Sequence, residues 1–103
     1  MLELTTENFD KEILESKEPA LVDFWAGWCG PCIQMAPVIE ALAEEYKDKG
    51  VKIGKLNVDE YGDVASRYNV LSIPTFIVFK NGAEAGRVTG AVPKQKLEGL
   101  LSK

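Results

Sequence analysis

The stretch Trp28-Cys29-Gly30-Pro31-Cys32 holds both cysteines of this 103-residue chain, three positions apart, where a strand-like run meets a helix-like one. One helical turn brings two Cα atoms within the roughly 4.4 to 6.8 Å that a disulfide accepts. The two thiols can therefore form and break a bond without moving the fold. We interpret this pair as a redox centre.

Three other interpretations of the cysteine pair are weaker. A structural zinc site needs about four nitrogen or sulfur ligands, whereas this chain offers two cysteines and no histidine. We therefore expect no metal. A stapling disulfide stabilises a fold mainly by closing a long loop, and this ring is small. Two inert buried thiols are the remaining alternative, but Trp28, Gly30 and Pro31 are poor fillers for an ordinary helix interior.

The composition is that of a globular protein, which we predict to be one domain over residues 1–103. Hydrophobic residues make up 46% and charged residues 27% of the chain, so disorder is not indicated. A chain of this length has room for a single core. The net charge of −4, with dispersed lysines, speaks against a nucleic-acid partner.

Targeting signals and membrane spans are also not expected. The first residues lack the basic and apolar regions of a secretory signal, and Asp23 interrupts the longest apolar run well short of about 18 residues. We therefore expect a cytoplasmic protein without a membrane partner. In that reducing compartment, a lone Cys-x-x-Cys is more often catalytic than structural.

Apolar periodicity predicts alternating strands and helices. Strands are expected at residues 2–4, 20–26, 51–58, 75–79 and 85–89, and helices at 7–16, 31–49, 63–68 and from Pro93 onwards. The run 20–26 is apolar on both faces, as in a central strand covered by helices. Asn81-Gly82 is a strong hairpin signal. The order predicts an α/β fold with a mixed sheet, parallel first and antiparallel later, and helices on both faces.

The motifs in this order resemble the thioredoxin family. They are Val22-Asp23-Phe24-Trp25-Ala26 followed by Trp28-Cys29-Gly30-Pro31-Cys32, and Ser72-Ile73-Pro74-Thr75 before the hairpin, with Lys55, Pro37 and Gly90-Ala91 at matching positions. The resemblance covers essentially the whole chain. It implies the thioredoxin fold, a five-stranded mixed β-sheet flanked by four α-helices. It also implies a thiol-disulfide oxidoreductase, without a cofactor, that carries electrons to disulfide-containing protein substrates, is recharged by a separate thioredoxin reductase and works as a monomer.

The two cysteines have different expected roles. Only a thiolate attacks a disulfide, and unpaired backbone N–H groups and the helix dipole stabilise a thiolate at a helix N-terminus. Cys29 is therefore the expected nucleophile. Cys32, about one turn further in, should be more enclosed and act as the resolving thiol, whose attack on the mixed disulfide releases the reduced substrate.

Asp23 is an acidic residue in an otherwise apolar strand. Burial raises a carboxyl pKa, and such a group near Cys32 can accept its proton during the resolving step, the role proposed for the aspartate of thioredoxins at this position. An aspartate that reaches solvent or bonds to backbone is the alternative. Lys55 points toward the same apolar layer, where we expect it to tune Asp23 by pairing with it directly or through water. A lysine with its head in solvent is the alternative.

The resemblance also implies a substrate-binding surface around Cys29. In thioredoxins the proline of the Ile73-Pro74 pair is cis and lies against the disulfide, and the residue before it binds an extended substrate by strand addition. The surface is expected to consist of Trp28, Gly30, Pro31, Ile73, Pro74, Gly90 and Ala91. Gly27 and Val70-Leu71-Ser72 flank it and depart from common family members, which would alter partner choice.

The residues between the cysteines set the direction of electron flow in this family. Oxidising and isomerising relatives commonly place a histidine there, where its charge stabilises the reduced thiolate. This chain has Gly30-Pro31 instead, so we expect a general protein-disulfide reductant. The non-enzymatic alternative is a binding module that holds a partner protein on the same apolar surface, with the cysteines incidental.

Overall fold

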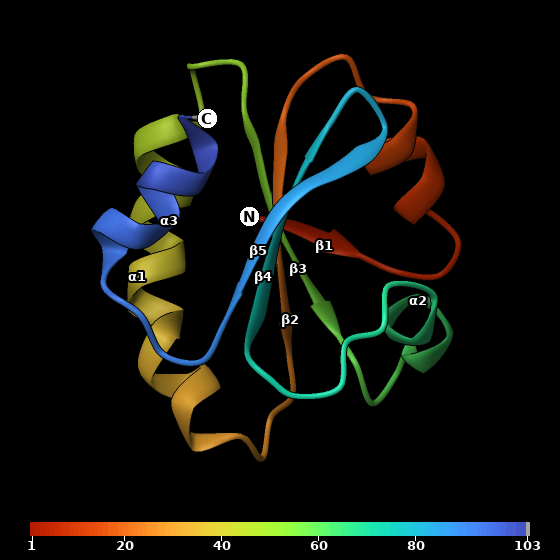
Figure 1. Ribbon diagram of the computed structural model, residues 1–103, viewed down its shortest axis with the longest axis vertical. Coiled ribbons are helices and arrows are strands. Elements are labelled where there is room, and N and C mark those ends of the chain that lie inside the picture. The colour runs from red at the N-terminus through yellow and green to blue at the C-terminus, as the bar shows by residue number, and fades with distance from the viewer. Residues whose placement is uncertain (103) are drawn as a thin grey trace.

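The fold is built on a five-stranded mixed sheet with the strand order β1-β3-β2-β4-β5 (Figure 1). It is seen in a computed structural model that describes residues 1–102. The strands are β1 (Leu2–Leu4), β2 (Ala20–Trp25), β3 (Lys52–Asn57), β4 (Thr75–Lys80) and β5 (Ala83–Thr89). β3 pairs in parallel with β1 and β2, whereas β4 runs antiparallel to β2 and β5 antiparallel to β4. The predicted mixed sheet is confirmed.

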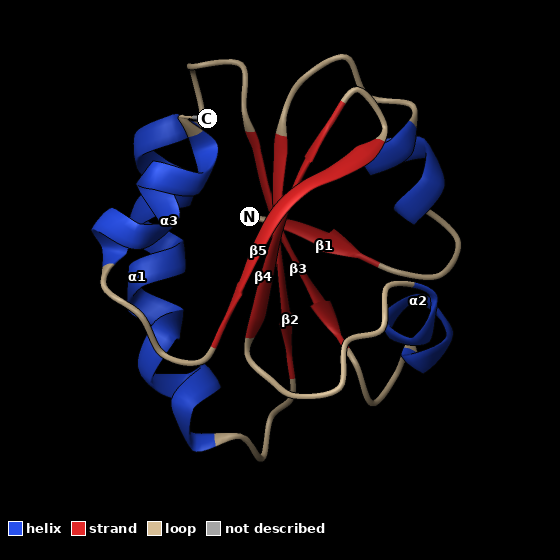
Figure 2. Cartoon of the chain, in the orientation of Figure 1, coloured by secondary structure: helices blue, strands red, loops and turns tan. Residues whose placement is uncertain are grey.

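Helices flank the sheet on both faces (Figure 2). They are η1 (Asp10–Leu14, a short π-helical segment), α1 (Gly30–Tyr46), α2 (Gly62–Arg67) and α3 (Lys94–Leu101). α1 and α3 lie on one face, and η1 and α2 on the other. The first helix is shorter than the predicted 7–16. Thr5 and Asn8 exchange side-chain to backbone hydrogen bonds of 2.7 and 3.2 Å that hold the segment before it in a turn.

The sheet separates two hydrophobic cores. Ala20, Val22 and Phe24 of β2 pack toward η1 and α2, whereas Leu21 packs toward α1 and α3. Alternation along the strand therefore places Asp23 on the face that α1 covers. Among the described residues, the buried polar side chains are Asp23 and Thr75. Asp23 is thus an exception on a face whose other buried side chains are apolar.

The β4–β5 hairpin forms at the predicted Asn81-Gly82. Both residues have positive φ, 54° and 77°, as a type I′ turn requires. A Cβ on Gly82 would lie 2.6 Å from the Leu14 carbonyl oxygen, so only glycine fits between the turn and the end of η1. A bulge between Val78 and Phe79 shifts the register of the hairpin.

Candidate active site

The two cysteines form a disulfide at the start of α1. Their Cα atoms are 5.2 Å apart, within the range that disulfide geometry accepts. Cys29 is the N-cap residue of α1, and its Sγ accepts a hydrogen bond of 3.2 Å from the backbone N–H of Cys32. Pro31 occupies the first turn, where its missing N–H is not needed. The local sequence therefore places the Cys29 sulfur at the positive end of the helix.

The expected difference in burial between the cysteines is wrong. Both residues are 4% exposed. Their surroundings differ instead. Cys29 Sγ lies 3.8 Å from the Ile73 carbonyl oxygen, on the side of the expected substrate surface. Cys32 faces a cavity that also contains Asp23.

The segment before β4 brings the expected substrate-binding residues together. The Ile73–Pro74 peptide bond is cis. Pro74 accepts a hydrogen bond of 2.8 Å from the N–H of Gly90, which joins the Gly90-Ala91 turn to this segment. Gly30, Pro31 and Ala91 are exposed, Ile73 and Gly90 are partly buried, and Pro74 is buried. The surface around the disulfide is therefore assembled from three separate segments, which are the start of α1, the segment before β4 and the turn after β5.

Trp28 is held at the edge of this surface by Asp59, a residue that the sequence alone did not predict to be part of the site. Its side chain is 71% exposed, and its indole N–H donates a hydrogen bond of 2.9 Å to the Asp59 carboxylate. Asp59 follows β3, and Trp28 follows the parallel neighbour β2. Carboxyl ends of adjacent parallel strands meet at one edge of a sheet, and this rule could have predicted the contact from the sequence.

A pocket beside Trp28 is lined by Trp28, Val58, Val70, Leu71, Ser72 and Ile73. Leu71 is 93% exposed.

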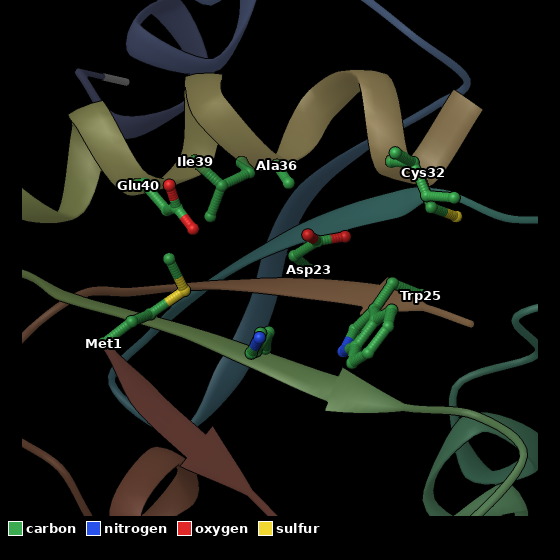
Figure 3. A pocket seen from close by; sticks show the side chains of 9 residues that line it. Met1, Asp23, Trp25, Cys32, Ala36, Ile39 and Glu40 are labelled. Carbon is green, nitrogen blue, oxygen red and sulfur yellow. The ribbon is translucent and has the colours of Figure 1, made fainter. Parts of the chain in front are cut away.

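Asp23 projects into a cavity of about 130 Å³ beneath α1. Figure 3 shows Cys32 and Trp25 toward one end of this space, and Met1 and Glu40 toward the other. Asp23 is only 5% exposed, and no described protein group hydrogen bonds to its Oδ1. Burial therefore raises the pKa of Asp23 from 3.8 to about 7, although the positive charge of Lys55 acts in the opposite direction. A carboxyl that titrates near neutral pH thus lies in the same cavity as Cys32.

Lys55 lowers the pKa of Asp23 through its charge, but it does not form the direct ion pair that was expected as an alternative to pairing through water. The two residues are register partners in the parallel strands β2 and β3, yet within residues 1–102 no direct bond joins their charged groups. The ammonium lies 4.9 Å from the centre of the Trp25 ring instead. A cation over an indole face is stabilised by the ring, and this contact competes with the carboxylate. The coupling to Asp23 is therefore electrostatic and at a distance.

Neither metal clusters nor spanning helices occur in the part of the chain that the structure describes. Residues 1–102 contain no group of three or more histidine, cysteine, aspartate or glutamate side chains that could hold a metal ion. Over the same residues, each helix is too short or too polar to cross a bilayer.

Comparison with known proteins gives consistent matches over the whole chain. The family model described as thioredoxin matches residues 1–103. Thioredoxin 1 of Synechococcus elongatus is 50% identical over 100 residues, which are 97% of this chain and 92% of that protein. Thioredoxin 2 of Chlorobaculum tepidum is 50% identical over 95 residues, covering 92% and 86% of the two chains. The chloroplastic M-type thioredoxin of Chlamydomonas reinhardtii is 50% identical over 97 residues, covering 94% and 69%.

Proposed function

This chain belongs to the thioredoxin family, and on that premise we propose that it is a general reductant of protein disulfides. It is a thiol-disulfide oxidoreductase whose dithiol reduces a substrate disulfide. The observation that carries the proposal is the Cys29–Cys32 disulfide at the first turn of α1. One sulfur there faces the substrate surface and the other faces a buried carboxyl.

Cys29 carries out the first exchange in the reduced protein. The Cys32 N–H, 3.2 Å from Cys29 Sγ, and the positive end of α1 favour the thiolate over the thiol. The thiolate attacks one sulfur of the substrate disulfide, so that a Cys29–substrate bond forms while the substrate S–S bond breaks. The second substrate sulfur leaves as a thiolate and takes up a proton.

Cys32 completes the reaction with Asp23 as its proton acceptor. Asp23 has a pKa of about 7, close to neutral pH, where proton transfer by a side chain is most effective. Once Cys32 has lost its proton, its thiolate attacks Cys29, the bond to the substrate breaks, and the substrate leaves reduced by two electrons. Lys55 keeps the pKa of Asp23 from rising further.

The substrate binds in extended form beside the disulfide. The Ile73 carbonyl lies next to Cys29, so a strand that pairs with the backbone at this residue would bring its own disulfide to the nucleophile. Main-chain bonds of this kind give affinity with little sequence preference. Side chains of the substrate contact the surface formed by Trp28, Gly30, Pro31, Ile73, Pro74, Gly90 and Ala91.

A complete cycle requires a second protein. The oxidised pair must receive two electrons, which we assign to a separate thioredoxin reductase, so the chain serves in electron transport between two proteins. We place it in the cytoplasm, because a reducing compartment keeps such a dithiol ready for attack. We expect it to act there as a monomer. Its net charge of −4 favours protein partners over nucleic acid.

The Cys32→Ser variant tests the proposed roles. With the resolving thiol gone, the first exchange should stop at the Cys29–substrate bond, and a covalent complex should accumulate on non-reducing gels. The matched control is the double variant Cys29→Ser, Cys32→Ser, which should form no such complex. A folded Cys32→Ser protein that traps no disulfide substrate would contradict the assignment. Partner binding that survives in the double variant would instead support a binding module.

A further inference from the structure

Met1 lines the end of the Asp23 cavity that lies opposite Cys32 (Figure 3). Its side chain lines this cavity together with Glu40 and Lys55, and it also lines a second, more open pocket between α1 and β3. Figure 3 shows its thioether rising toward Glu40 and Ile39 of α1, at the opposite end of the cavity from Cys32. Met1 therefore contacts both solvent and the space that Asp23 faces.

The two methionines of the chain differ sharply in accessibility. Met1 is 49% exposed, whereas Met35 is 3% exposed in the core beneath α1 and α3. Oxidants convert accessible thioethers to sulfoxides, which are polar where the thioether was apolar. The methionine that lines the Asp23 cavity is thus also the one that an oxidant in solution reaches first.

We propose that Met1 is a peroxide-oxidation site whose state controls the entry of water to the Asp23 cavity. One oxygen of hydrogen peroxide is transferred to the Met1 sulfur, the O–O bond breaks, and the remaining oxygen leaves as water with both hydrogens. The sulfur loses two electrons and the peroxide gains them. The disulfide form of the protein presents no free thiol to compete for the oxidant.

Oxidation should change the solvation of Asp23 and leave the charges around it unchanged. The charged groups around this cavity are Lys55 from β3, Glu40 from α1 and the α-amino group of Met1 itself, whereas Cys32 is held in the disulfide and does not titrate. None of these groups is altered by the reaction. Burial is the main cause of its raised pKa. A polar sulfoxide at the mouth draws water into a cavity that has room for it, so the pKa of Asp23 should fall.

The test treats the disulfide form with hydrogen peroxide and follows Met1 by mass spectrometry and the Asp23 carboxyl by NMR titration. Met1 should oxidise well before Met35, and the midpoint of Asp23 should fall by about one pH unit. A Met35→Leu variant, which keeps core volume, restricts the reaction to Met1. Equal oxidation rates for the two methionines, or a Met1 sulfoxide with an unchanged Asp23 midpoint, would overturn the inference.

A matched control separates oxidation from mere change at this position. In a Met1→Leu variant the side chain at this position stays apolar but cannot take up oxygen, so peroxide should leave the Asp23 midpoint where it was. The effect on catalysis rests on the proposed role of Asp23. If the midpoint shifts but the pH dependence of turnover does not, the proton-acceptor role fails while the Met1 inference stands.

Discussion

Asp23 shows how a single residue can oppose the stability of the fold that surrounds it. Its carboxyl is buried with an unpaired Oδ1, and an ionised group in that position loses the solvation it has in the unfolded chain. The positive charge of Lys55 could compensate for this loss, but it also interacts with the Trp25 ring. The protein therefore carries a destabilising group next to its reactive sulfur.

We expect Asp23→Asn to stabilise the protein in a pH-dependent way. Because the folded pKa is about 7 against an ordinary 3.8, the unfolded chain ionises first, and wild-type stability falls as the pH rises from about 4 to about 7. The variant lacks this loss. It should match the wild type near pH 4 and exceed it by up to about 4 kcal/mol above pH 8.

Urea denaturation of the oxidised wild type and the oxidised Asp23→Asn variant, from pH 4 to above pH 8, measures the difference in their free energies of unfolding. In single-turnover kinetics, the variant should release the substrate from the mixed disulfide more slowly. A variant that is equally stable at pH 8, or whose advantage does not change with pH, would show that the Asp23 carboxyl is not held in its neutral form by burial.

At the scale of elements, the site depends on where strands end. β2 and β3 are parallel neighbours, so Trp28 and Asp59 emerge at the same sheet edge and join through a hydrogen bond. An indole that is 71% exposed would otherwise sample several rotamers. The bond between two loops therefore orients a large apolar side chain beside the disulfide.

Asp59→Ala should weaken the reaction with protein substrates. Loss of one hydrogen bond, worth about 0.5–1 kcal/mol, predicts a two- to fivefold lower kcat/KM, because Trp28 is no longer pre-oriented. Reduction of a small-molecule disulfide, which needs little of the surface, should change less. Steady-state rates with the two substrates make the comparison, and Glu60→Ala, which removes the adjacent exposed charge, is the control. Equal losses with both substrates would argue that Asp59 acts on the cysteines instead.

For the whole molecule, the sequence predicted the architecture far better than the contacts between elements. Strand 20–26 was identifiable because it is apolar on both faces, and the hairpin because Asn81-Gly82 demands positive φ. Side-chain neighbours depend on the twist of the sheet and the packing angle of α1, which periodicity does not contain. That is why the structure was needed to show the equal burial of the two cysteines, the Trp25 contact of Lys55 and the position of Met1 beside the Asp23 cavity.

The reduction potential is a property of the whole molecule and tests the direction of electron flow. Gly30-Pro31 places no cationic side chain between the cysteines, so the reduced form gains no stabilisation beyond that of the helix N-terminus. We expect a potential at or below about −220 mV. Titration against a dithiol redox buffer, with Trp25 and Trp28 fluorescence as the signal, provides the value. A potential near about −120 mV would identify an oxidant.

The bulge in the β4–β5 hairpin affects how easily other chains can pair with the edge of the sheet. β5 is an edge strand, and edges recruit other chains unless they are twisted or charged. Here the bulge distorts the register, Glu84 and Arg87 form an ion pair of 2.7 Å, and Arg87 is also tied to the Tyr68 carbonyl. These features should discourage further copies of the chain from pairing with the β5 edge, away from the substrate surface proposed at Ile73.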